Sequence, residues 1–232
     1  MFIMLRKIEV FVLIIIFLFI NMNSHSFASN KGDLIDSMVK SCNGNIQEYG
    51  IRFSFNANGN GEEICSSILK KINPNIKDID NVVRNDKLYC IEIKSNIING
   101  YIESINYDNY NVVTVNLTKK DNVNNLTDFK KDISSALSKD YNVNTYFMYI
   151  KFKVDSQDLE HINEKLGVVI KEHGGTDIQT VQLENGFSST AYTGRYSPIK
   201  SAGRSIDLNY AVCKYPSGID VIIGTPEILT SY

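Results

Sequence analysis

Apolar residues follow three different patterns along this chain. Residues 11–20 are all apolar, and a polar stretch follows them directly. Beyond residue 30, apolar positions recur either every three to four residues or at every second residue. The first spacing predicts amphipathic helices, and the second predicts strands with one buried face. The chain therefore predicts a mixed α and β protein behind an apolar leader.

The predicted helices each lie between residues that favour helix ends. They are residues 31–42, a segment from Asn60 to Asn73, residues 125–139, and a segment from Asp155 or Ser156 to Gly174. The predicted strands alternate in polarity and are separated by turn residues. They are residues 51–55, 76–83, 87–94, 98–106, 109–119, 148–154, 177–184, 187–196, 205–214 and 218–224. Asn185-Gly186 is a strong hairpin signal.

The order of one strand, one helix and four strands occurs twice, over about 46–119 and about 145–224. Helices on one face of antiparallel strands indicate an α+β fold. We therefore expect two pseudo-repeats with antiparallel curved sheets and helices on one face. Residues 29–140 form the first pseudo-repeat with a leading and a linking helix, and residues 141–232 form the second. No Pro- or Ser-rich linker separates them, which favours one compact body.

The N-terminus has the layout of a secretory signal peptide from Met1 to Ala28. Arg6 and Lys7 precede the apolar run, and Ser26 and Ala28 provide the small residues that a signal peptidase requires. Cleavage after Ala28 predicts an extracytoplasmic protein, either secreted or held in the cell envelope. The alternative is an uncleaved anchor, although the run is short for a membrane span, which needs about 20 apolar residues. In that case the segment would be the chain's contact with the membrane.

The charge of the exported part argues against nucleic acid as a partner. The whole chain has 24 basic and 26 acidic residues, and loss of Arg6, Lys7 and Glu9 leaves a net charge of about −3. Proteins that bind nucleic acid or an anionic membrane surface need a basic footprint instead. The charge thus favours neither partner.

The four cysteines are compatible with two disulfides or with free thiols. They are Cys42, Cys65, Cys90 and Cys213. An even number in an exported chain permits two bridges with three possible pairings. However, Cys42 and Cys65 fall on the apolar faces of predicted helices, where a free cysteine acts as a small hydrophobic side chain.

The C-terminal half contains several short motifs: Asn185-Gly186-Phe187, residues 189–193, residues 208–212, and the ending from Ile223-Gly224-Thr225-Pro226-Glu227-Ile228 to Tyr232. In these motifs the chain resembles the YwmB family of exported proteins from Gram-positive, spore-forming bacteria. The resemblance implies a duplicated fold similar to the TATA-box-binding protein. It also implies an exported protein of unestablished biochemical role without recognised catalytic residues. A fold alone does not carry function, so DNA binding does not follow from it.

The chain has no motif that predicts a catalytic site, a metal site or a cofactor. Ser-x-x-Lys occurs three times without the partner motifs of serine acyl-enzymes. Glu92 and Glu103 lie on neighbouring predicted strands and form the basis of one alternative, an envelope hydrolase with a pair of carboxylates. The simpler interpretation is two carboxylates on a solvated sheet face.

The favoured interpretation is a non-enzymatic binding or accessory protein of the cell envelope. Residues that alternate with the core positions of the strands form an outer sheet face that suits a protein or wall-polymer ligand. We place the binding residues at Lys94, Tyr149, Lys151, Lys153, Asp207 and Asn209. The binding region is this sheet face or the groove between the repeats. A weaker alternative is a structural partner that oligomerises through its sheet edges.

Overall fold

The computed structural model describes residues 33–72 and 79–230. The signal peptide predicted at residues 1–28 lies outside them. The chain divides into two units, residues 1–34 and residues 35–232, and all the described strands belong to the second. Among the described residues, no helix combines the length and the apolar character needed to cross a membrane.

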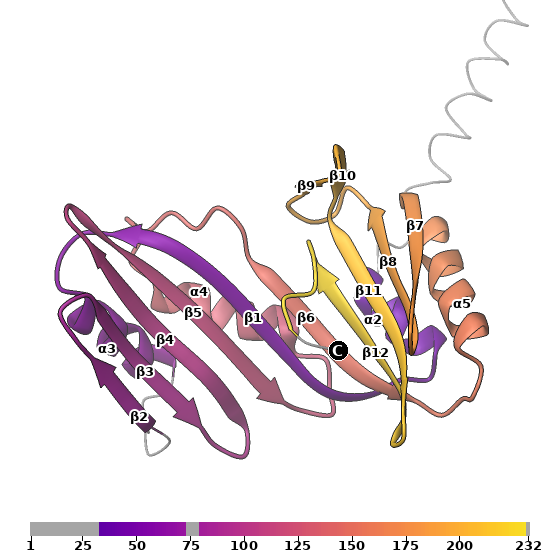
Figure 1. Ribbon diagram of the computed structural model, residues 1–232, viewed down its shortest axis with the longest axis horizontal. Helices are drawn as coiled ribbons and strands as arrows, with labels where there is room; N and C mark the ends of the chain where they lie inside the picture. The colour runs from indigo at the N-terminus through magenta and orange to yellow at the C-terminus, as the bar shows by residue number, and fades with distance from the viewer. Residues whose placement is uncertain (1–32, 73–78, 231–232) are drawn as a thin grey trace, which may run out of the picture. The chain divides into compact units, whose positions relative to one another are not determined.

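Ten of the described strands form one antiparallel sheet in the order β2-β3-β4-β5-β1-β6-β12-β11-β8-β7 (Figure 1). In the first half of the chain they are β1 (Asn45–Ala57), β2 (Ile79–Arg84), β3 (Leu88–Lys94), β4 (Ile98–Tyr107) and β5 (Tyr110–Lys120). In the second half they are β6 (Phe147–Val154), β7 (Thr176–Leu183), β8 (Gly186–Tyr192), β11 (Leu208–Tyr215) and β12 (Gly218–Thr225). In each half the first strand pairs with the last, and β1 pairs with β6 in the middle.

Four described helices pack on one side of this sheet (Figure 1). They are α2 (Leu34–Ser41), α3 (Gly61–Ile72), α4 (Leu126–Ala136) and α5 (Leu159–Glu172). Alternate residues of the central strands point into the core beneath them, and Phe53 and Phe152 are at most 1% exposed. The helices contribute residues such as Ile68, Leu166 and Ile170. Full burial of one such side chain stabilises the fold by about 1.5–3 kcal/mol. The predicted α+β class is thus confirmed.

The starts of α3 and α5 show where the capping prediction is right and where it is wrong. The Asn60 side chain accepts hydrogen bonds from the backbone N–H groups of Glu62 and Glu63, at 2.9 and 3.4 Å, so Asn60 does cap α3. The cap of α5 is Asp158, which accepts from His161 N at 2.9 Å, and not Asp155 or Ser156. Ser156 Oγ instead accepts from Asp158 N, so it forms a turn before the helix.

The second half also differs from the prediction between β8 and β11. The strand predicted over 187–196 ends at Tyr192, and a separate hairpin of β9 (Ile199–Ser201) and β10 (Arg204–Ile206) follows. The hairpin turn is shifted by one residue, because Gly186 already belongs to β8. A Cβ atom at Gly186 would lie 1.9 Å from the Val212 carbonyl oxygen, so this glycine permits the close approach of β8 and β11.

Candidate functional site

The sheet face opposite the helices, called here the outer face, carries polar side chains at its centre. On β6, Tyr149, Lys151 and Lys153 are partly exposed and alternate with Ile150 and Phe152, which are fully buried. This is the alternation that the sequence predicts. Three of the predicted binding residues therefore lie in a row on one strand at the junction of the two halves of the sheet.

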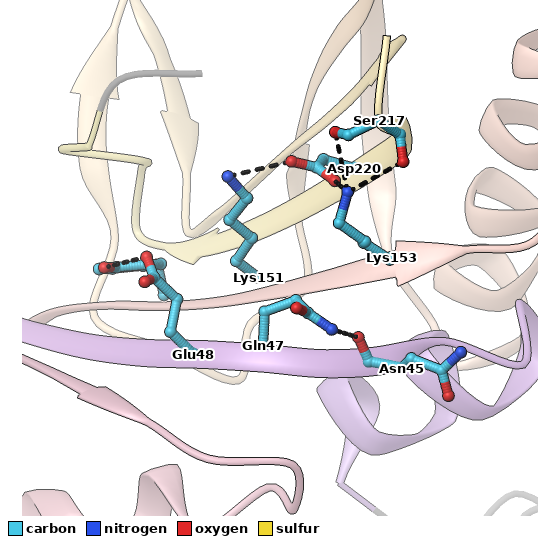
Figure 2. Close-up of polar contacts among 8 residues, drawn as sticks. Asn45, Gln47, Glu48, Lys151, Lys153, Ser217 and Asp220 are labelled. Atoms are coloured by element: carbon cyan, nitrogen blue, oxygen red, sulfur yellow. Dashed lines mark hydrogen bonds and ion pairs between the residues drawn. The ribbon is translucent and has the colours of Figure 1, made fainter. Parts of the chain in front are cut away.

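Lys151 and Lys153 hold one buried carboxylate between them (Figure 2). Lys151 Nζ lies 3.0 Å from Asp220 Oδ2, and Lys153 Nζ lies 3.3 Å from Asp220 Oδ1. The second contact is an ion pair without good hydrogen-bond geometry, since Asp220 Oδ1 accepts no hydrogen bond. Lys153 Nζ also donates to Ser217 Oγ at 2.9 Å and to its carbonyl oxygen at 3.2 Å. These contacts fix both ammonium groups along β6.

Tyr149 forms the second half of this network. Its hydroxyl donates to Glu48 Oε1 at 3.0 Å and lies 2.9 Å from Thr118 Oγ1. The Tyr149 phenol has one proton, which forms the hydrogen bond to Glu48. The Thr118 hydroxyl must therefore donate to Tyr149 in the second bond. Burial raises the pKa of Tyr149 well above its usual range, and the nearby Glu48 carboxylate raises it further. The phenol therefore stays protonated and acts as a hydrogen-bond donor.

A β-bulge in β1 turns Glu48 toward this network. Ile46 pairs with Phe152, but the next pair joins Glu48 to Lys151, so Gln47 is an extra residue. Gln47 Nε2 donates to the carbonyl oxygen of Asn45 at 3.0 Å (Figure 2) and to that of Ile46 at 3.3 Å. The extra residue shifts the phase of the alternation by one position. Ile46 therefore lies on the helix side with Phe152, while Glu48 points outward with Lys151. Bulges that re-aim side chains are common beside functional sites.

Asp207 and Asn209 do not lie on an open face, contrary to the prediction. Asp207 is fully buried, and its carboxylate accepts hydrogen bonds from the backbone N–H groups of Thr193, Arg195 and Tyr196. It therefore fixes the loop after β8. Asn209 is 7% exposed, donates to Ser189 O at 2.9 Å and accepts from Ile228 N at 3.2 Å. Both side chains hold the chain's own loops against the sheet.

The segment after β12, residues 226–230, folds back over the outer face. A Cβ atom at Gly224 would lie 2.8 Å from the backbone of Glu227 and Ile228, so the segment runs directly over this glycine. Together with β1, β5 and β6, it encloses a cavity of about 90 Å³ beside Tyr149. The polar residues of its lining are Arg52, Asn116, Thr118, Tyr149, Glu227 and Thr230. This cavity lies at the junction of the two halves.

The other candidate residues lie elsewhere on the sheet. Lys94 is exposed on β3, four strand positions from β6, which corresponds to about 19 Å at the usual strand spacing. Glu92 and Glu103 are diagonal neighbours on the outer face of β3 and β4, since Glu92 pairs with Tyr101 and Glu103 with Cys90. Neither carboxylate lines the cavity at Tyr149. The predicted set therefore separates into a central cluster and a distant lysine.

Burial rather than pairing characterises the cysteines. Cys42, Cys65, Cys90 and Cys213 are all free and buried. Within the described ranges, no group of three or more His, Cys, Asp or Glu residues is arranged to hold a metal ion. Comparison with known proteins adds no relative: no family model matches this chain, and no curated protein does either.

Proposed function

We propose that this chain is an exported, non-enzymatic binding or accessory protein of the cell envelope, related to the YwmB family. Two features support export and kinship: the signal-like segment from Met1 to Ala28 and the C-terminal motif that ends in Glu227-Ile228. The strand order supports a duplicated, TATA-box-binding-protein-like fold. It reads β2-β3-β4-β5-β1 in one half and, in reverse, β7-β8-β11-β12-β6 in the other. Each half thus contributes to the sheet one strand before its helix and four after it, and the second half carries the β9–β10 hairpin in addition.

The observation that carries the binding role is the fixed polar network at the centre of the outer face. Glu48 and Thr118 hold Tyr149, Asp220 and Ser217 hold Lys153, and Asp220 holds Lys151, yet each of these three side chains is partly exposed. Side chains fixed before a ligand arrives lose little entropy on binding, which favours recognition. The raised pKa of Tyr149 keeps its phenol a donor instead of a proton acceptor. These properties suit a binding face better than acid–base chemistry.

The composition of the same face favours an envelope protein or a wall polymer over nucleic acid. Lys151 and Lys153 are neutralised in part by Asp220, and Glu48 lies next to them. A surface that follows a phosphate backbone needs uncompensated positive charge. We therefore assign the face to a ligand that carries both charged groups and hydrogen-bond acceptors. The charged groups would meet the lysines and carboxylates of the face, and an acceptor would meet the Tyr149 phenol.

A retention experiment with matched variants tests this proposal. The protein is produced from the full-length gene, purified as its host processes it, immobilised, and exposed to envelope extract and to purified cell wall. Ser54→Arg places a bulky side chain on the outer face of β1, while Ser135→Arg does so on the exposed surface of α4. Each serine makes one side-chain hydrogen bond, at 3.0 and 2.7 Å.

We expect a ligand that the natural chain and the Ser135→Arg variant retain and that the Ser54→Arg variant loses. Circular dichroism spectra of the two variants establish that both are folded. Retention of nothing beyond a denatured control, or equal retention by both variants, contradicts the proposed use of the outer face.

A further inference from the structure

The cavity beside Tyr149 is the right size for one functional group of a ligand. Its volume of about 90 Å³ is well below the roughly 300–1,000 Å³ of pockets that enclose a whole drug-sized molecule. A sugar ring or an amino-acid residue needs more room than this. A ligand on the outer face would therefore insert a single small group here, while the rest of it lies on the sheet.

The lining of the cavity combines one positive charge with several hydrogen-bond donors. Arg52 points outward from β1, is exposed, and forms no ion pair with any residue that the structure describes. It pairs across the strands with Asn116 of β5 and Phe147 of β6. Asn116 adds an amide and Thr230 a hydroxyl. A guanidinium has five N–H donors in a fork that matches the two oxygens of a carboxylate.

Two acidic residues limit the charge that the cavity accepts. Glu227 lines the cavity on the side of the C-terminal segment, and Glu48 lies next to it as the acceptor from Tyr149. Like charges at short range repel, so a dianion such as a phosphate monoester is disfavoured relative to a monoanion.

We infer that this cavity is a carboxylate-binding site in which Arg52 is the charge partner of an acidic group on the ligand. This inference rests on the proposed function and assigns a chemical class to one part of its ligand. Glu227 opposes the bound carboxylate by charge repulsion. Removal of the Arg52 charge should therefore weaken binding of the carboxylate, and removal of the Glu227 charge should strengthen it. A purely structural role for the cavity does not predict these opposite effects.

Acetate is the probe, and the assay is a titration followed by ¹H–¹⁵N NMR at pH 7. The protein comes from the full-length gene as its host processes it, and sodium chloride holds the ionic strength constant. We expect saturable shifts of the backbone N–H signals of Asn116 and Thr230, which line the cavity, with a dissociation constant in the millimolar range. Glu227→Gln should bind acetate about three- to tenfold more tightly, because it removes a nearby like charge. Arg52→Gln should abolish the shifts, and the control Arg204→Gln, on β10, should leave them unchanged.

Three results would overturn the inference. They are shifts no larger than those that chloride produces, unchanged acetate affinity in Arg52→Gln, and weaker binding in Glu227→Gln. A parallel titration with dimethyl phosphate separates carboxylate from phosphodiester ligands, and tighter binding of dimethyl phosphate than of acetate also overturns the carboxylate assignment. The two proposals fail separately. A chain that retains an envelope ligand but shows no acetate site contradicts only this inference, whereas one that binds acetate through Arg52 but retains no envelope ligand contradicts the proposed function.

Discussion

Replacing Gly50 by alanine is expected to displace the Tyr149 ring from the outer face. Gly50 lies on β1 opposite Tyr149 of β6, and the ring lies across it. A Cβ atom at Gly50 would lie 2.3 Å from Tyr149 Cε1, and its three nearest neighbours would all belong to that ring. The ring has to move, because this distance is far inside van der Waals contact. Movement also breaks the bonds of Tyr149 to Glu48 and Thr118.

The expected loss of stability for Gly50→Ala is about 2–5 kcal/mol. Overpacking in a well-packed region costs about 1–3 kcal/mol. The hydrogen bond from Thr118 contributes about 1 kcal/mol, and the bond to the charged Glu48 about 1.5–3 kcal/mol. Part of this loss is recovered, because both partners become accessible to water once the ring moves. Backbone strain adds nothing, since Gly50 is not among the residues with positive φ.

A double-mutant cycle measured by urea denaturation tests this reasoning. The four proteins are the natural chain, Gly50→Ala, Tyr149→Ala and the double variant. With the ring absent, alanine at position 50 should cost less than about 0.5 kcal/mol, so the coupling free energy should equal most of the single-variant loss. A cost for Gly50→Ala that is the same in both backgrounds would refute the idea that the ring sets the requirement for glycine.

Three further predictions concern charge, thiols and one loop. Burial raises the pKa of the Asp121 carboxyl, but hydrogen bonds from Asn125 and Tyr49 outweigh this and hold the pKa below its ordinary value. Asp121 therefore stabilises the fold above the ordinary carboxyl pKa of about 3.9, and this contribution is lost as the pH falls through the lower folded value. Asp121→Asn should lower urea stability by about 1 kcal/mol at pH 7 and by almost nothing near pH 2, and an equal loss at both pH values would contradict this. Burial raises the pKa of the Cys65 thiol to about 12 and raises the pKa of each of the other three thiols. A thiol-reactive dye should thus label the native protein slowly at pH 8 and label four thiols in guanidinium without reductant; a count below four would indicate a disulfide. Asp207→Ala should cost about 2–4 kcal/mol and should abolish hydrogen-exchange protection selectively in the loop after β8, because three backbone donors lose their acceptor. Unchanged protection there would show that Asp207 does not hold the loop.

Alternation and capping were enough to locate most of the elements. Phe53 and Phe55 point into the core while Arg52 and Ser54 are exposed, as a two-residue period requires. The strong signals have local causes, such as the Asn60 side chain at the start of α3. The order of the elements along the chain could therefore be predicted, apart from the β9–β10 hairpin.

The candidate site was only partly visible in the sequence, because periodicity gives the side of a strand and not what covers it. Asn209 has the outward phase that alternation predicts, yet the segment with Ile228 buries it. The cavity escaped prediction for a related reason. Its polar lining comes from β1, β5, β6 and the segment after β12, which are brought together only by the folded sheet. Arg52 was recognisable as an outward residue, but nothing local to β1 distinguishes it from a solvated arginine.

The position of β12 has a consequence for the order of folding. β12 is the last strand along the chain, yet it lies inside the sheet between β6 and β11. Until residues 218–225 are available, β6 has an open edge and the strands β11, β8 and β7 have no central strand to join. Pairings between residues so far apart in sequence form slowly, because a long loop must close before the contact is gained. A chain that can complete its sheet only after its final strand has emerged therefore keeps the two ends of the sheet unjoined until nearly all of its residues are available.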